Sequence, residues 1–185
     1  ELGLSKTPFK NVHYYYPYSD ARIHNTYLEK ENVKNNIDSG KAHMFKYEYR
    51  HDKENLDLMF SSIDDPGQTM DSILNYIISG RGEFGNLDSW EDFLKNVKEC
   101  GEAGVHGDKE IIYNNPLFGS IKETDKEIRI SQALADIKKN EVHVIDIAKL
   151  SDDMQAFVFG DAIKAIYNLK LSPDDEANPP SKIVI

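Results

Sequence analysis

The chain contains a single cysteine, Cys100, so no disulfide bond can form within it. Because structural disulfides are a feature of secreted proteins, we expect a protein of the reducing cytoplasm. No apolar run approaches the roughly 20 residues that a membrane-spanning helix requires. Residues 1–6 also lack the basic and apolar regions of a signal peptide. These absences argue against a disulfide-stabilised secreted domain and against a membrane protein, and we predict no membrane partner.

Basic residues are few relative to acidic ones. The 22 Lys and Arg residues are outnumbered by 32 Asp and Glu residues, which gives a net charge of −10. An acidic chain repels phosphate backbones at long range, so we expect this chain alone to bind nucleic acid poorly. The composition, with 39% hydrophobic and 29% charged residues, is typical of a globular protein. A length of 185 residues suits one domain, 1–185, with a substantial core.

Motifs of metal and nucleophile chemistry are also missing. The six histidines show no HExxH pair or other paired spacing of zinc ligands, and no GxSxG elbow occurs. They are His13, His24, His43, His51, His106 and His143. His143 lies in an apolar segment, and we interpret it as a hydrogen-bonded core histidine. The sequence therefore predicts no metal site and no catalytic residue in this chain.

The segment Gly80–Gly85 reads GRGEFG and matches the GxGxxG fingerprint of dinucleotide-binding proteins. That motif must follow a strand and open directly into a helix, so that backbone amides meet the pyrophosphate. Here the preceding residues have a helical pattern, and the next helix is expected only near Asp88. We favour a flexible glycine loop and keep a dinucleotide-binding domain as an alternative. Arg81, within the loop, is a hypothetical subunit-interface residue.

Three stretches have strand patterns. Residues 9–16 are rich in aromatic and apolar side chains and end at Pro17, and we expect their tyrosines in the core rather than as a stacking platform. Residues 41–50 alternate apolar and charged side chains, which predicts a half-exposed strand at a sheet edge. Residues 142–147 are apolar on both faces, which predicts a buried strand. Together the strands and helices predict an α/β protein.

The middle of the chain, residues 52–119, is predicted to be largely helical, either as an insertion or as a divergent part of the core. Three apolar stripes at helical spacing support this. They are Leu56, Met59, Phe60 and Ile63; Met70, Ile73, Leu74, Ile77 and Ile78; and Trp90, Phe93, Leu94 and Val97. Asp88 and Ser89 are candidate caps of the third helix, and Gly101 is its expected stop. Thr124 and Glu127 predict a capping box ahead of a helix through Ile128, Leu134, Ala135 and Ile137.

Residues 142–185 predict a right-handed βαβ unit of a parallel sheet. After the strand, Ser151 is the expected cap of a long helix with an apolar stripe, and Ile183 belongs to the next strand. The stripe consists of Met154, Phe157, Val158, Ala162, Ala165, Ile166 and Leu169. Asp146 falls at the carboxyl end of the first strand, where α/β folds place ligand sites. It is either a functional acid or a cap of the following turn.

The last residues follow a polar, proline-rich connection, residues 172–180, which cannot continue a helix. Residues 182–185 then read as the beginning of a buried strand. We expect the protein to continue beyond Ile185, because a central strand is seldom so short.

Three stretches, taken together and covering about a third of the chain, resemble HerA-type ATPases of the HerA–FtsK group. The first resembles the segment after their second core strand, the second their strand and helix before Walker B, and the third the approach to the Walker B strand. These stretches are Leu2–Leu4 through Phe9 with Asn11–Tyr15 and Pro17; Val142–Ile147 with Leu150, Asp153, Gln155 and the helix to Leu169; and Pro179–Ile185.

The resemblance implies a partial RecA-like parallel or mixed sheet that lies between Walker A and Walker B and contains neither motif. The parent would be a hexameric, ATP-dependent DNA translocase of helicase type, using ATP and Mg²⁺. Its partners would be the other subunits of the ring, DNA and a nuclease. No residue here matches the Walker motifs, so no catalytic, cofactor-binding or metal residue is assigned and the chain alone should be inactive. The alternative is a non-enzymatic interaction domain that recruits a partner through a tyrosine-rich edge strand.

Overall fold

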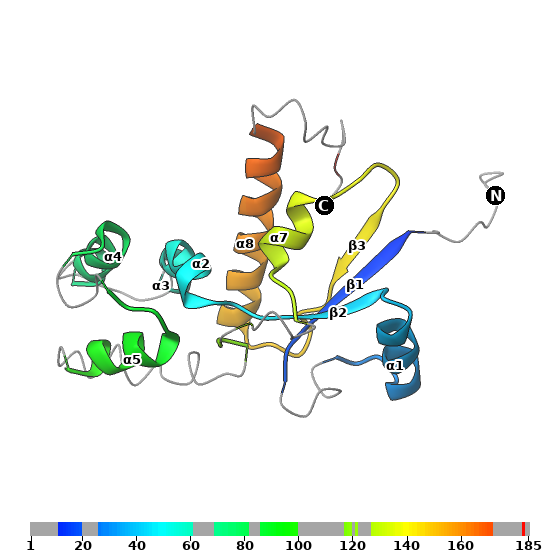
Figure 1. Ribbon diagram of the computed structural model, residues 1–185, viewed down its shortest axis with the longest axis horizontal. Coiled ribbons are helices and arrows are strands. Elements are labelled where there is room, and N and C mark those ends of the chain that lie inside the picture. The colour runs from blue at the N-terminus through cyan, green and yellow to red at the C-terminus, as the bar shows by residue number, and fades with distance from the viewer. Residues whose placement is uncertain are drawn as a thin grey trace.

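A computed structural model describes residues 11–19, 26–60, 69–81, 86–99, 117–119, 121, 127–171 and 183. The described residues form a mixed α/β structure around a three-stranded sheet (Figure 1). Its strands are β1 (Val12–Pro17), β2 (Ala42–Phe45) and β3 (Val142–Ile145). Their order is β2-β1-β3, and both pairs are parallel. The α/β class and the parallel arrangement predicted from the sequence are confirmed.

The tyrosines of β1 alternate between the two faces of the sheet, as the period of a strand requires. Tyr15 packs in the main hydrophobic core, whereas Tyr16 packs in a smaller cluster on the opposite face. Tyr15 and Tyr16 are buried, which agrees with their expected place in the core. The tyrosine run therefore offers no stacked row of exposed rings.

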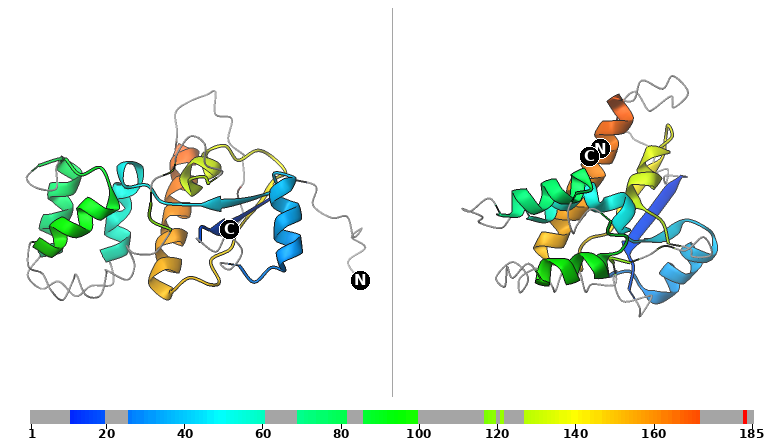
Figure 2. Two further views of the ribbon diagram at one scale, coloured as in Figure 1. Left: turned by 60° about the horizontal axis from the view of Figure 1, so that its bottom comes forward. Right: turned by 60° about the vertical axis from the view of Figure 1, so that its left-hand side comes forward.

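Helices cover both faces of the sheet (Figure 2). α1 (Lys30–Asp38) packs Val33 and Ile37 against β1 and β2 on one face. α7 (Ile130–Ala135) and α8 (Asp152–Leu171) cover the other face together with Tyr15 and Phe45. The result is three layers, the usual solution for a parallel sheet whose two faces are both apolar.

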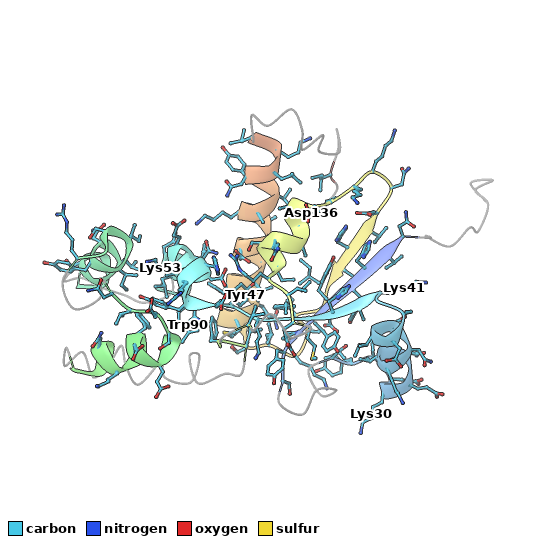
Figure 3. All side chains as sticks on the ribbon, viewed as in Figure 1. Lys30, Lys41, Tyr47, Lys53, Trp90 and Asp136 are labelled. Carbon is cyan, nitrogen blue, oxygen red and sulfur yellow. The ribbon has the colours of Figure 1, made fainter. Side chains whose placement is uncertain are left out.

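The predicted edge strand at residues 41–50 is shorter than its alternating pattern. β2 lies at an edge of the described sheet but ends at Phe45. Tyr47 and Tyr49 are 1% exposed and pack edge-on against Phe157 and Trp90. The indole Nε1 of Trp90 also donates to the Tyr47 carbonyl at 3.0 Å (Figure 3). These aromatic contacts place the tyrosines inside the core, so they offer no exposed surface for a partner.

β3 differs from the prediction of a strand buried on both faces over residues 142–147. The strand ends at Ile145, and Val144 is 38% exposed. On that face of the sheet α1 packs against β1 and β2 but not against β3, so no residue of α1 covers the side chain of Val144.

The described residues of the middle of the chain are largely helical, as predicted, and they form an arm beside the sheet (Figure 2). The arm is made of α2 (Tyr49–Asp52), a 3-10 turn (Lys53–Asn55), α3 (Leu56–Phe60), α4 (Thr69–Ser79) and α5 (Trp90–Glu99). Leu56, Ile77 and Phe93 are fully buried and share one core with the sheet and α8. Ile78, expected in the same apolar stripe, is 56% exposed, because α4 buries the Leu74–Ile77 side.

The cap of α5 is confirmed. Ser89 Oγ accepts the amide of Asp92 at 3.1 Å and donates to the Asp92 carboxylate at 2.7 Å. Asp88, the other candidate, instead pairs with Arg50 on the surface at 3.1 Å. The expected stop at Gly101 lies outside the described residues.

α7 is shorter than the predicted helix. It begins at Ile130 with Arg129 at the cap position, and Ile128 forms an isolated parallel bridge with Phe45. Ile128 therefore extends the sheet instead of opening a helix, and Ala135 at the other end is exposed. Thr124, the expected cap, lies outside the described residues.

The long helix α8 confirms the predicted stripe, with Met154, Phe157, Val158, Ala162 and Leu169 buried. Of the predicted βαβ unit, β3 and α8 are described. The second strand is not, because Ile183 is its one described residue and has no strand assignment. None of the helices in the described ranges is long and apolar enough to cross a membrane.

Buried polar groups tie the arm to α8. Asn55 Nδ2 donates to Asp161 at 2.7 Å, and Lys164 Nζ donates to Asn55 Oδ1 at 2.7 Å. Burial, followed by the charge of Asp52, raises the pKa of Asp161 to about 6. Arg129 pairs with Asp52 at 3.2 Å. The junction therefore holds two buried acids, Asp52 and Asp161, and burial outweighs the two neighbouring cations in setting the pKa of Asp161.

Candidate functional site

The strand order places a topological switch point between β1 and β3. From β1 the chain passes through α1 on one face to β2, and it reaches β3 on the other side of β1 with α7 on the opposite face. In open parallel sheets ligands bind outside the carboxyl ends of the strands at such a point. The candidate site is therefore the carboxyl end of the β1–β3 pair.

Asp146 lies at this position, as the sequence predicted. Its carboxylate accepts hydrogen bonds from the Tyr14 hydroxyl, from Thr26 Oγ1 at 2.6 Å and from the amide of Ala148 at 3.1 Å. Thr26 comes from the loop after β1 and is 3% exposed. The cluster thus joins the loop after β1 to the loop after β3. Asp146 accepts from Thr26 in the first loop and from the amide of Ala148 in the second.

The hydrogen bonds decide the charge of the cluster. Burial alone would raise the pKa of Asp146, but donation from Thr26, Tyr14 and the Ala148 amide outweighs it, so the pKa lies below its ordinary value. Burial and the neighbouring Asp146 raise the pKa of Tyr14 to about 12. At neutral pH the cluster is therefore a carboxylate held by neutral hydroxyl donors.

A groove of about 480 Å³ lies beside this cluster. Its lining is mostly apolar, with Leu28 and Val144 on its walls and Asp146 as its charged group. Tyr27 is 74% exposed, and the ammonium of Lys149 lies 4.9 Å from the centre of its ring. Asp146 Oδ1 accepts one amide and has capacity for a second donor, so the groove suits an apolar group that carries a hydrogen-bond donor.

The structure does not bring Arg81 to this site. Arg81 is exposed and lies two residues after the end of α4, a helix of the arm that Figure 1 shows away from the sheet. Gly80 has φ +64°, and the amides of Gly80 and Arg81 donate to Ile77 and Tyr76, at 3.3 and 3.1 Å. This is a Schellman motif, in which glycine ends a helix. The first glycine of GRGEFG therefore follows a helix rather than a strand; residues 82–85 lie outside the described ranges.

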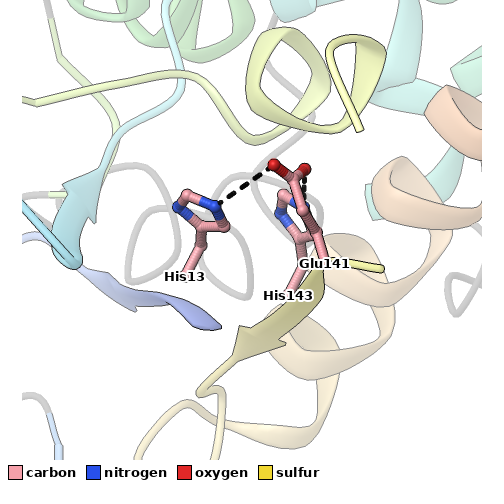
Figure 4. A group of neighbouring side chains, drawn as sticks. All are labelled: His13, Glu141 and His143. Carbon is pink, nitrogen blue, oxygen red and sulfur yellow. Dashed lines mark hydrogen bonds and ion pairs between the residues drawn. The ribbon is translucent and has the colours of Figure 1, made fainter. Parts of the chain in front are cut away.

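A second polar cluster lies at the amino ends of the same strands, and the sequence did not predict it. His13 and His143 stand directly opposite each other in the β1–β3 register, and both imidazoles approach Glu141 (Figure 4). The sequence did contain one indication of this cluster: Glu141 and His143 are two residues apart, so they lie on the same face of an extended chain. His13 could be added only from the strand order.

His143 is hydrogen-bonded, as expected from the sequence, and it also takes part in this cluster. Its side chain is 10% exposed, with Nε2 at 3.2 Å from Glu141 Oε2 and Nδ1 at 3.0 Å from the Tyr15 hydroxyl. Burial lowers the pKa of His143, and the hydrogen bond to Glu141 opposes this effect. The ring is therefore held at both nitrogens.

Comparison with protein-family models, with curated proteins and with solved structures finds no match for this chain. The class that the fold defines is a three-layer α/β protein with a parallel sheet and a helical arm.

Proposed function

We propose that this chain is the part of a HerA-type, ATP-dependent DNA-translocating motor that lies between its Walker A and Walker B motifs. The observation that carries the proposal is the β3–α8 unit. A parallel strand, followed directly by Asp146, leads into a 20-residue helix with the expected buried stripe. This is the order of elements that the resemblance implies just before a Walker B strand.

The position of the Asp146 cluster is consistent with such a motor. P-loop proteins hold nucleotide phosphates at the carboxyl ends of parallel strands, where glycine-rich loops open into helices. The Asp146 cluster lies at that edge, where its role would be to hold two loops together. ATP and Mg²⁺ would be bound by the Walker residues of the parent and by no residue of this chain.

Uncovered apolar surface gives further support. On α8, Phe159, Tyr167 and Leu171 are 56, 61 and 61% exposed and follow one another at multiples of four residues. Their spacing puts them on one side of the helix, away from the buried stripe. A helix with apolar residues on two sides is expected inside a larger core, so we assign this side to further parts of the motor subunit or to its neighbours in a ring.

The first test is the complete reading frame and its product. A GxxxxGK[ST] motif is expected before Glu1 and an Asp-Glu pair a few residues after Ile185, and the encoded protein should hydrolyse ATP faster when DNA is added. Absence of both motifs would overturn the proposal. The 185-residue chain should show no heat of ATP binding in calorimetry, and a micromolar affinity would contradict the assignment.

The same protein tests Arg81 as a residue that acts on a neighbouring subunit. Arg81→Ala should lower ATP hydrolysis while leaving the thermal unfolding temperature unchanged, because its side chain is exposed. Arg50→Ala is the matched control, since Arg50 is an exposed arginine of the same arm, paired with Asp88. Equal ATPase rates for both variants would remove Arg81 from the mechanism.

A further inference from the structure

We propose that His13, Glu141 and His143 form a binding site for one divalent transition-metal ion, with Zn²⁺ as the best-fitting metal. The ligands would be Nε2 of each imidazole and one carboxylate oxygen of Glu141. The site lies at the amino ends of β1 and β3, at the opposite end of the strands from Asp146. It is independent of the motor proposed above.

The backbone brings the two histidines together. His13 and His143 are partners in the parallel register of β1 and β3, so their side chains leave the same face of the sheet. Their rings are stacked, with centroids 4.9 Å apart and planes at 23° (Figure 4). Glu141, directly before the first residue of β3, reaches both rings.

The donor atoms already lie close to the separations that a metal requires. Glu141 Oε2 is 3.2 Å from His143 Nε2, and Glu141 Oε1 is 3.7 Å from His13 Nε2. One donor atom from each residue can be chosen so that all three lie within 4.8 Å of one another. Tetrahedral zinc with bonds of about 2.0–2.1 Å places its donors about 3.3 Å apart. Small side-chain rotations would therefore bring the three donor atoms to these separations.

Groups behind the ligands hold two of them in place. The Tyr15 hydroxyl is 3.0 Å from His143 Nδ1, and Tyr15 is 4% exposed. With Nε2 on a metal, Nδ1 carries the hydrogen and donates it to Tyr15. The Lys138 amide donates to Glu141 Oε2 at 2.8 Å. Such outer hydrogen bonds orient metal ligands and raise their basicity.

The ligand types select the class of metal. Two imidazoles and one carboxylate suit Zn²⁺ and its first-row neighbours, whereas Ca²⁺ and Mg²⁺ prefer oxygen ligands. Three protein ligands leave a fourth position, and the His13 side chain, 34% exposed, is the side on which water can reach it. A bound ion would also join the starts of two strands that are far apart in the sequence.

Calorimetric titration of the chelator-treated chain with ZnCl₂ tests the site. A Cys100→Ser background removes the one thiol that could compete. We expect one ion per chain with micromolar or tighter affinity and a rise in the unfolding temperature. His13→Gln and His143→Gln should each weaken binding at least about 100-fold, because each removes one of three ligands. Visible absorption of a Co²⁺ complex should report tetrahedral coordination.

His51→Gln is the matched control, because His51 is an exposed histidine 3.6 Å from Glu48 and outside the proposed site. It should leave the affinity unchanged. Tyr15→Phe should keep the three ligands and weaken binding about 10-fold, the usual effect of losing an outer hydrogen bond. If a histidine variant fails to fold, the affinity of Tyr15→Phe for Zn²⁺ still tests the site. Millimolar affinity in the parent chain, or equal affinities in the parent, His13→Gln and His143→Gln, would overturn the proposal.

Discussion

At the carboxyl ends of β1 and β3 the carboxylate of Asp146 is surrounded by hydroxyl and amide donors, whereas at the amino ends the carboxylate of Glu141 meets two imidazoles. Both clusters use the same pair of strands. At the first end hydroxyl and amide hydrogens point inward to the carboxylate, so the cluster stabilises two loops. At the second end three residues converge that can all present lone pairs, so the cluster can accept a cation.

The two carboxylates also owe their low pKa values to different groups. For Asp146 burial opposes ionisation, and donation from Thr26 and Tyr14 overcomes it. For Glu141 the amide of Lys138 is the largest cause of the lowered pKa, followed by an opposing effect of burial and then by His143. We therefore expect the fold to depend strongly on Asp146 and only weakly on Glu141.

The largest expected effect is that of Asp146→Ala. The substitution leaves the Tyr14 and Thr26 hydroxyls and the Ala148 amide without their shared acceptor and should cost about 2–4 kcal/mol of unfolding free energy. Urea denaturation of the parent and the variant measures it. Glu141→Ala is the comparison variant. A loss at Glu141 as large as that at Asp146 would refute the contrast between the two ends.

Asp161→Asn extends the comparison to a carboxylate with too few donors. Native Asp161 keeps its proton up to about pH 6, whereas in the unfolded chain it releases it near the ordinary value of 3.8. The native state therefore binds more protons between these values, and stability falls as the pH rises through this window. The variant should equal the parent near pH 4 and be more stable by about 2–3 kcal/mol above pH 7.

Denaturation of both proteins at several pH values measures this difference. Asp57→Asn removes the same charge from an exposed side chain of α3 and serves as the control. A constant difference between Asp161→Asn and the parent at every pH would show that Asp161 does not titrate in the predicted window.

Thr26→Val should have an intermediate effect. Valine has nearly the shape of threonine, but it removes the hydroxyl that donates to Asp146 and accepts the amide of Leu28 at 3.2 Å. Because Thr26 is buried, we expect a loss of about 1–2 kcal/mol in urea denaturation. Thr26→Ser keeps the hydroxyl and should recover more than half of that loss. Equal losses for the two variants would show that packing, rather than the hydrogen bonds, accounts for the effect.

The smallest effect is expected for Glu141→Gln in the absence of metal. Glutamine retains an oxygen for the Lys138 amide, and the ion pairs that it loses involve partly exposed histidines, so the cost should be about 0.5 kcal/mol. Adding Zn²⁺ should enlarge the difference between parent and variant, because the metal stabilises the form that binds it. A difference that zinc does not change would contradict the metal site.

Local patterns predicted much of the fold. The buried stripe of α8 and the cap at Ser89 depend on neighbours within one or two turns, and the structure confirms them. The alternating pattern of residues 41–50 correctly predicted that Phe45, Tyr47 and Tyr49 share one burial state, but it did not predict that Tyr49 begins a helix. The end of β2 at Phe45 was not predicted, because the backbone partners of Tyr47 are Leu117 and Gly119, which lie far along the chain. Ile128 was assigned to a helix for the same reason, since its partner is Phe45.

The candidate sites show the same division. Asp146 was predicted because the end of an apolar strand can be recognised from its own residues. Tyr14 and Thr26 were not assigned to it, because their approach depends on β1 lying beside β3. The helical pattern before Gly80 argued against a dinucleotide-binding role for the GxGxxG match. The structure shows that Gly80, its first glycine, ends α4 in a Schellman motif.

The sequence by itself determined which residues form strands and helices and which of their faces are apolar, because these properties repeat over a few residues of chain. The tertiary structure alone decided that β1 lies between β2 and β3, and with it the pairing of His13 with His143 and of Tyr14 with Asp146. The spacing of apolar residues specifies which face of a strand or helix is buried, but it does not specify which element packs against that face. The exposed Val144 follows from the same limit, since an apolar side chain cannot indicate which helix will cover it.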